Sequence, residues 1–216
     1  MDFTIQIDFS TDALDAIALA GQRVTLVRSV LSFVSSQQFE AMPDAFTPKP
    51  AVAWLVLSPK QTNRIQWDER CDLYAAALLP PLLGVIKPEA STTNAQPGDT
   101  WKFQNGHFSR ESASAPSDYR VGNQQDDDVC LGLISAATVN DHLRPAAPLN
   151  IQQALLNEKV LFSIADPQTV TIFLSNVVAD GSIVPDGISG LDVTLASGSP
   201  LKVGFNDARN AFFIAS

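Results

Sequence analysis

The segment Gly84-Val85-Ile86-Lys87-Pro88 has the same pattern of glycine, isoleucine and proline as Gly181-Ser182-Ile183-Val184-Pro185. The three shared residue types recur at a constant offset of 97, from 84 to 181, from 86 to 183 and from 88 to 185. Weaker matches continue on both sides of this pair at offsets of about 100 residues, the kind of period that indicates a duplicated structural unit. The sequence therefore predicts two similar units.

Length and local pattern predict what each unit is. The chain has 216 residues, enough for two units of roughly 100 residues, the size of an immunoglobulin-like sandwich. Short apolar runs alternate with turn residues at the spacing expected of an all-β protein. We expect an all-β fold of two tandem antiparallel β-sandwich units, residues 1–112 and 113–216. One short helix is expected near residues 11–20, where Ser10 or Thr11 can cap the first turn.

A polar segment separates the two expected units. Residues 109–128 are rich in Ser, Asp, Asn and Gln and end in Asp126-Asp127-Asp128, so we expect an inter-unit linker here, with the boundary near residue 115. The three carboxylates could also bind calcium, but they lack the alternating spacing and central glycine of a dedicated loop. A solvated linker is the favoured interpretation, and no metal site or cofactor is predicted.

Composition limits the partners and the compartment. Hydrophobic residues make up 45% of the chain and charged residues 17%, which favours a compact protein. A net charge of −9 opposes binding to nucleic acid and to anionic lipid. The first residues lack the pattern of a signal peptide, and no apolar run reaches the roughly 18 to 20 residues that span a bilayer. We therefore expect a cytoplasmic protein, with non-classical export left open.

Cysteine and tryptophan positions are interpreted through the repeat. Cys71 and Cys130 do not fall opposite each other in the two copies, so we expect both to be reduced thiols. Trp54, Trp67 and Trp101 align with apolar positions of the second copy. This favours core positions over exposed platforms for sugar rings.

Catalytic patterns are weak. The two histidines, His107 and His142, are too few for most transition-metal sites, and no serine lies in a nucleophile-elbow pattern. No glycine-rich phosphate-binding loop is present either. We therefore assign no catalytic residue and favour a role without catalysis.

The most unusual local feature is the apolar segment from Ala75 to Ile86. Its centre is Leu78, Leu79, Pro80, Pro81, Leu82 and Leu83, whereas the aligned part of the second copy is more polar. An apolar surface in one copy only suggests a task that this copy performs alone. These six residues are the candidate contact surface, either for the second unit, for another copy of the chain, or for a ligand or lipid.

Three functions remain open from the sequence. The leading hypothesis is a non-enzymatic binding or self-assembling protein whose partner is a glycan, another protein or a second copy in a homo-oligomer. The first alternative is a membrane-active, toxin-like protein that inserts residues 75–86. The second alternative is a small-molecule enzyme with a cleft between the units, using Asp141, His142, Asp68 or Glu69 as acid or base.

Overall fold

The architecture is mostly β. The computed structural model describes residues 2–35, 50–113, 118–164, 166–177, 179–185 and 189–215. Strands hold 58% of these residues and helix 5%. The prediction of a β-rich chain with one short N-terminal helix is therefore confirmed.

The elements follow one another along the chain as one helix among many strands. They are β1 (Asp2–Asp8), α1 (Thr11–Leu19), β2 (Arg23–Arg28), β3 (Val30–Ser35), β4 (Ala51–Ala53), β5 (Leu55–Leu57), β6 (Thr62–Asp68), β7 (Asp72–Ala76), β8 (Ala90–Ser91), β9 (Asp99–Gln104), β10 (His107–Ala113), β11 (Tyr119–Asn123), β12 (Val129–Val139), β13 (His142–Pro148), β14 (Gln152–Ala154), β15 (Lys159–Ile164), β16 (Gln168–Ser175), β17 (Ser182–Val184), β18 (Leu191–Leu195), β19 (Leu201–Asn206) and β20 (Ala211–Ile214).

The helix begins and ends where its sequence signals lie. Ser10 is the N-cap, and its Oγ accepts a hydrogen bond of 3.0 Å from the backbone N–H of Ala13. Ala13 and Ile17 form the buried face. Gly21, at φ +64°, takes the left-handed conformation that commonly follows a helix.

Four sheets organise the strands. The largest has nine strands in the order β20-β19-β1-β6-β12-β7-β8, with β13 and β14 also paired to β12. The others run β10-β9-β11-β15-β3, β18-β16-β2-β5 and β17-β4. Two pairs are parallel, β1 with β19 and β9 with β11, so two of the sheets are mixed rather than purely antiparallel as expected.

The structure does not show two tandem units. Each of the four sheets joins strands from residues 1–112 with strands from residues 113–216. In the largest sheet, for example, β12 lies between β6 and β7, and β1 lies between β6 and β19. Hydrogen bonding therefore does not separate the chain at residue 112.

The two copies of the glycine-isoleucine-proline pattern lie side by side. Val85 forms an antiparallel bridge with Ser182, the backbone N–H of Ile86 donates to the carbonyl of Gly181, and that of Ile183 donates to the carbonyl of Gly84. The glycine of each segment is thus opposite the isoleucine of the other. The shared pattern belongs to β17 and to a loop segment that is bridged to it.

The described residues of the polar segment, 109–113 and 118–128, belong largely to strands, and the boundary expected near residue 115 lies outside the described residues. The segment contains the end of β10 and all of β11, and β11 pairs with both β9 and β15 inside the five-stranded sheet. Tyr119, Val121 and Asn123 alternate on the buried side of β11. Ser109 and Ser112 are exposed on β10, and Gln124 and Asp126 are exposed in the bend that follows β11.

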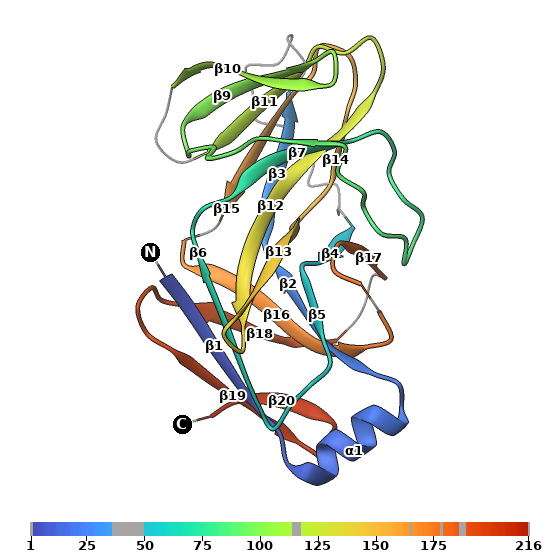
Figure 1. Ribbon diagram of the computed structural model, residues 1–216, viewed down its shortest axis with the longest axis vertical. Helices are drawn as coiled ribbons and strands as arrows, with labels where there is room; N and C mark the ends of the chain where they lie inside the picture. The colour runs from blue at the N-terminus through green and yellow to red at the C-terminus, as the bar shows by residue number, and fades with distance from the viewer. Residues whose placement is uncertain are drawn as a thin grey trace.

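The molecule is elongated, with an upper and a lower lobe in Figure 1. The lower lobe holds α1, the sheet β18-β16-β2-β5 and the β20-β19-β1-β6 end of the largest sheet, and the upper lobe holds the five-stranded sheet with β7, β8 and β14. The chain passes between the lobes from β2 to β3, from β6 to β7, along β12, and from β15 to β16. We call this level the waist.

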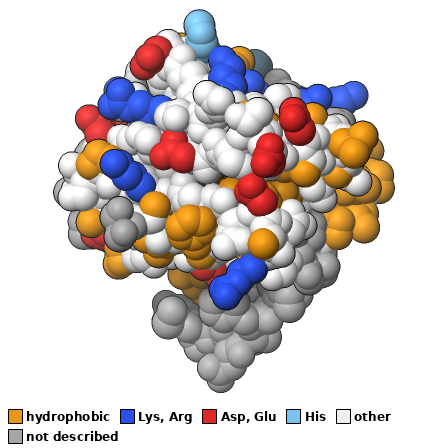
Figure 2. Space-filling view, turned by 90° about the horizontal axis from the view of Figure 1, so that it is seen from below, with side chains coloured by type: hydrophobic (Ala, Val, Ile, Leu, Met, Phe, Trp, Pro, Cys, Tyr) orange, Lys and Arg blue, Asp and Glu red, His pale blue; other side chains and the backbone are white. Residues whose placement is uncertain are grey.

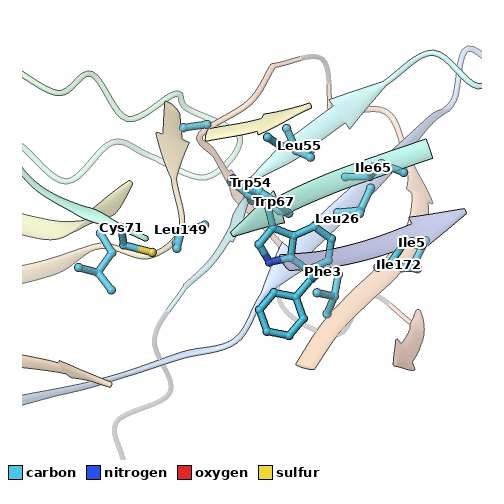
Figure 3. Close-up of a cluster of buried hydrophobic side chains, with 14 of the residues drawn as sticks. Phe3, Ile5, Leu26, Trp54, Leu55, Ile65, Trp67, Cys71, Leu149 and Ile172 are labelled. Carbon is cyan, nitrogen blue, oxygen red and sulfur yellow. The ribbon is translucent and has the colours of Figure 1, made fainter. Parts of the chain in front are cut away.

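The core near the waist is built around two tryptophans. Figure 3 shows Trp54 and Trp67 among side chains from the largest sheet and from the sheet that contains β2 and β16. Trp54 and Trp67 are both buried, which confirms the prediction of core positions for these two residues. Trp101 is half-buried and packs at the edge of the core.

Candidate functional site

The candidate contact residues of the sequence lie in one ordered loop. We define the leucine loop as residues 77–86, which connect β7 to the segment leading into β8 and include no charged residue. Leu78 is 81% exposed and Leu82 is 61% exposed, and Leu79 and Leu83 are also exposed. Pro81 is exposed and Pro80 is half-buried. The four leucine side chains therefore point to solvent rather than packing against another part of the chain.

Backbone hydrogen bonds hold this loop in place. The N–H of Leu83 donates to the carbonyl of Ile183 at 3.0 Å, and the N–H of Ile86 donates to the carbonyl of Gly181 at 2.9 Å. The loop thus lies along one edge of β17, and the other edge of β17 pairs with β4. Ile86 itself is buried in a small cluster with Ile183 and Val52. The loop is thus the outer strand-like segment of a short ladder, anchored at its base.

The tip of the loop contains a strained leucine. Leu83 has φ +63°, a left-handed conformation that is unfavourable for a residue with a Cβ. The N–H of Gly84 donates to the carbonyl of Pro81 at 2.8 Å, so Leu83 is the third residue of a tight turn, a place that glycine usually takes. At position 84 a Cβ would lie 2.8 Å from the Pro81 carbonyl oxygen, so glycine is required there. Strain of this kind is often found at functional positions.

A second feature, which the sequence did not predict, is a buried arginine at the waist. Arg28 ends β2 and is 3% exposed. Its guanidinium lies 4.9 Å from the ring centroid of Trp54 and 5.6 Å from that of Trp67, within the range of cation–π attraction. Its two terminal nitrogens donate to Ser135 Oγ and Gln168 Oε1, each at 3.0 Å.

The partners of Arg28 are themselves held by the two tryptophans. Trp67 Nε1 donates to Gln168 Oε1 at 3.0 Å, and Trp54 Nε1 donates to the carbonyl of Ser135 at 2.9 Å. Among the described residues, no carboxylate lies within ion-pair distance of Arg28. Burial lowers the pKa of Arg28, although Cys71, Tyr119 and Asp68 act on that pKa in the opposite direction. We call Arg28, Trp54, Trp67, Ser135 and Gln168 the arginine cluster.

Cys71, just before β7, and Cys130, in β12, are both buried and form no disulfide. Burial raises the pKa of Cys71, although the neighbouring Arg28 charge acts in the opposite direction. Burial also raises the pKa of Cys130. Both sulfurs are therefore protonated and shielded near neutral pH, the state of an unreactive thiol.

A thiol-labelling experiment checks this state. We expect a disulfide reagent such as Ellman's reagent to label neither cysteine rapidly in the native protein at pH 8, because the thiolate is the attacking form. Addition of denaturant should expose both thiols and give two equivalents. Rapid labelling of one thiol in the native protein would contradict the burial described here.

A cleft opens on the outer side of the arginine cluster. It has a volume of about 400 Å³ and lies at the waist, between the passage from β6 to β7 and the middle of β12. Its lining comprises Gln66, Trp67, Asp68, Arg70, Cys71, Asp72, Asn94, Ala95, Ile134, Ser135, Ala136, Ala137, Thr138, Leu143 and Ala146. Burial alone would raise the pKa of Asp68, but the hydrogen bonds and charge of Arg70 outweigh it and lower that pKa.

The residues suggested as acids or bases of an enzyme do not meet in this cleft. Asp68 lines it and is paired with Arg70, whereas Glu69, Asp141 and His142 are not part of its lining. Asp141 lies in the turn between β12 and β13, at φ +64°. In the described part of the chain, no three His, Cys, Asp or Glu side chains are grouped so that they could hold a metal ion.

Acidic, basic and hydrophobic side chains are interspersed on the face shown in Figure 2. No helix within the described ranges has the length and apolar character needed to cross a membrane. Comparisons of the chain with protein-family models, with curated proteins and with solved structures found no match.

Proposed function

We propose that this protein is a non-enzymatic binding protein that assembles with a second copy of itself through the leucine loop. The observation that carries the proposal is the exposure of four leucines on one anchored loop. Contiguous exposed apolar surface on a folded protein is typical of an interaction site. A homo-oligomer was also one of the partners expected from the sequence.

Charge favours a second copy over several other partners. The whole chain has a net charge of −9, so two copies repel each other at most orientations. The leucine loop has no charged residue, so loop-to-loop contact joins the surfaces where this repulsion is smallest. An apolar patch is also complementary to itself, which suits a twofold interface.

The anchoring of the loop reduces the cost of association. The loop is fixed by hydrogen bonds to residues 181–183 and by burial of Ile86. A surface that is already ordered loses less conformational entropy on binding than a flexible one. The strain at Leu83 fits this role, because it places one more apolar side chain at the exposed tip.

The oligomeric state tests the proposal. We expect native mass spectrometry and sedimentation at micromolar concentrations to detect a homo-oligomer. The double variant Leu78→Ser, Leu82→Ser should shift the protein toward monomer, because it removes the two most exposed leucines of the loop. Leu19→Ser is the matched control, since Leu19 is 92% exposed on α1, at the far end of the lower lobe.

Leu83→Gly separates association from folding. Relief of the left-handed conformation should raise the free energy of unfolding of the monomer by about 1 kcal/mol. Loss of the side chain should weaken self-association at the same time. A variant that is more stable and less associated would support the role of the leucine side chain at the tip.

Other results would lead to other partners. A wild-type protein that stays monomeric at about 100 μM would refute self-assembly. This concentration is well above the dissociation constants of most specific interfaces. Dye release from neutral vesicles that disappears in the double serine variant would support the membrane-active alternative. A co-purified glycan in the mass spectrum would support the glycan alternative.

A further inference from the structure

The waist cleft is formed by an interruption of the largest sheet. β12 pairs with β6 at Thr138 opposite Gln66, and with β7 at Ile134 opposite Asp72. Between these pairs, residues 67–71 face residues 135–137 without pairing, so the ladder opens. The pairing of β12 with β13 also shifts register between Ser135 and Ala137. Residues 67–71 and residues 135–137 both pass from one lobe to the other here. Regular backbone hydrogen bonds therefore do not close the gap.

The cleft has an apolar wall and a polar wall. The apolar wall consists of Ile134, Ala136, Ala146 and Leu143. The polar wall carries Asp72 and Asn94, with Gln66 and Thr138 at the opposite end of the gap. A volume of about 400 Å³ is within the range of small-molecule sites. A few polar groups on an otherwise apolar lining are also typical of such sites.

The two carboxylates of the lining, Asp68 and Asp72, differ in their hydrogen-bond partners. Asp68 accepts hydrogen bonds from the backbone and the guanidinium of Arg70. Asp72 Oδ1 accepts from Thr92 Oγ1 at 3.1 Å and from the N–H of Ala95 at 2.9 Å. No described residue donates to Asp72 Oδ2, and Asp72 forms no ion pair within the described ranges. Asp72 is thus oriented through Oδ1, and the guanidinium of Arg70 in the same lining acts on its charge without a hydrogen bond to it.

We infer that the waist cleft binds a small organic ammonium compound, with its cationic group on Asp72 and its apolar part against Ile134 and Leu143. A carboxylate with one free oxygen pairs well with a charged N–H donor. The net charge of −9 raises the local concentration of cations around the molecule. The arginine cluster lies behind the floor of the cleft and keeps that floor rigid, since Ser135 belongs to both. This site is separate from the leucine loop and does not depend on self-assembly.

The test compares two probes of similar shape. Butylammonium chloride is added to the isotope-labelled protein at constant ionic strength, with 1-butanol as the uncharged analogue. We expect saturable shifts of the amide signals of Asp72, Asn94 and Thr138 with butylammonium, and at least tenfold weaker binding of butanol. Tenfold corresponds to the usual strength of a hydrogen bond to a charged group. Equal binding of both probes, or shifts that never saturate, would overturn the inference.

Two variants locate the site. Asp72→Asn keeps an oxygen for Thr92 and Ala95 but removes the charge, and it should weaken butylammonium binding about tenfold. Asp126→Asn makes the same charge change on an exposed turn and should leave binding unchanged. Ala136→Phe, at an exposed lining position, should fill the cleft and abolish binding while the denaturant midpoint stays close to that of the wild type. Unchanged binding in Asp72→Asn and Ala136→Phe would place the ammonium compound elsewhere and refute the site.

Discussion

Replacement of Trp67 by alanine is expected to lower the free energy of unfolding by about 3 to 5 kcal/mol, the cost of truncating a buried aromatic side chain. The Trp67 ring stacks on Phe3 at 5.6 Å between centroids and meets Trp54 edge-on at 5.3 Å. Truncation also removes the Nε1 hydrogen bond to Gln168 and one of the two rings beside Arg28. Urea denaturation measures the loss as a lower midpoint at unchanged slope.

Leu19→Ala is the control for this measurement. Leu19 is 92% exposed, so its truncation should change stability by less than about 0.5 kcal/mol. A loss below about 1 kcal/mol for Trp67→Ala would mean that the core near the waist is not packed as Figure 3 shows.

Arg28→Ala is expected to be destabilising by about 3 to 5 kcal/mol, because it leaves a space beside two indole rings and breaks two buried hydrogen bonds. Part of this loss is offset, since the variant no longer buries a charge that has no carboxylate partner among the described residues. Urea denaturation of the purified variant gives the net value.

Arg28→Met distinguishes packing from charge. Methionine fills most of the same volume, and an apolar replacement of a buried charge is often neutral or stabilising. Gln168 Oε1 would keep its hydrogen bond from Trp67, so few polar atoms would be left alone. We therefore expect Arg28→Met to lose less than about 1.5 kcal/mol. If methionine is as harmful as alanine, the two hydrogen bonds of the guanidinium dominate and the packing argument is wrong.

Local patterns predicted the elements better than their arrangement. The helix cap at Ser10 follows from neighbouring residues alone. The burial of Trp54 and Trp67 was predicted by comparison of two copies that the structure does not show as repeated units. The two matching glycine-isoleucine-proline segments indicated a duplication, but they are partners in one short ladder. Two extended segments that pair with each other have similar steric requirements, so similar residues do not by themselves show that a unit is repeated.

The arginine cluster and the cleft could not be assembled from local patterns. Arg28 lies 107 positions from Ser135 and 140 from Gln168 in the sequence. No local pattern near these residues predicts that they form hydrogen bonds with one another. The one available signal was the charge itself, because Arg28 lies in a run of residues otherwise suited to burial. The gap beside it depends on how β12 meets two other strands, which only the three-dimensional register decides.

The parallel pairing of β1 with β19 has a consequence for the order in which this protein forms. Ile5 lies opposite Leu201 and Ile7 opposite Val203, so one edge of β1 has no partner until residues 201–206 have been synthesised. While the chain is still on the ribosome, that edge is an open template for wrong strand pairing. The lower lobe therefore cannot complete its part of the largest sheet until β19 has left the ribosome, more than 190 residues after β1, since β1 ends at Asp8 and β19 begins at Leu201.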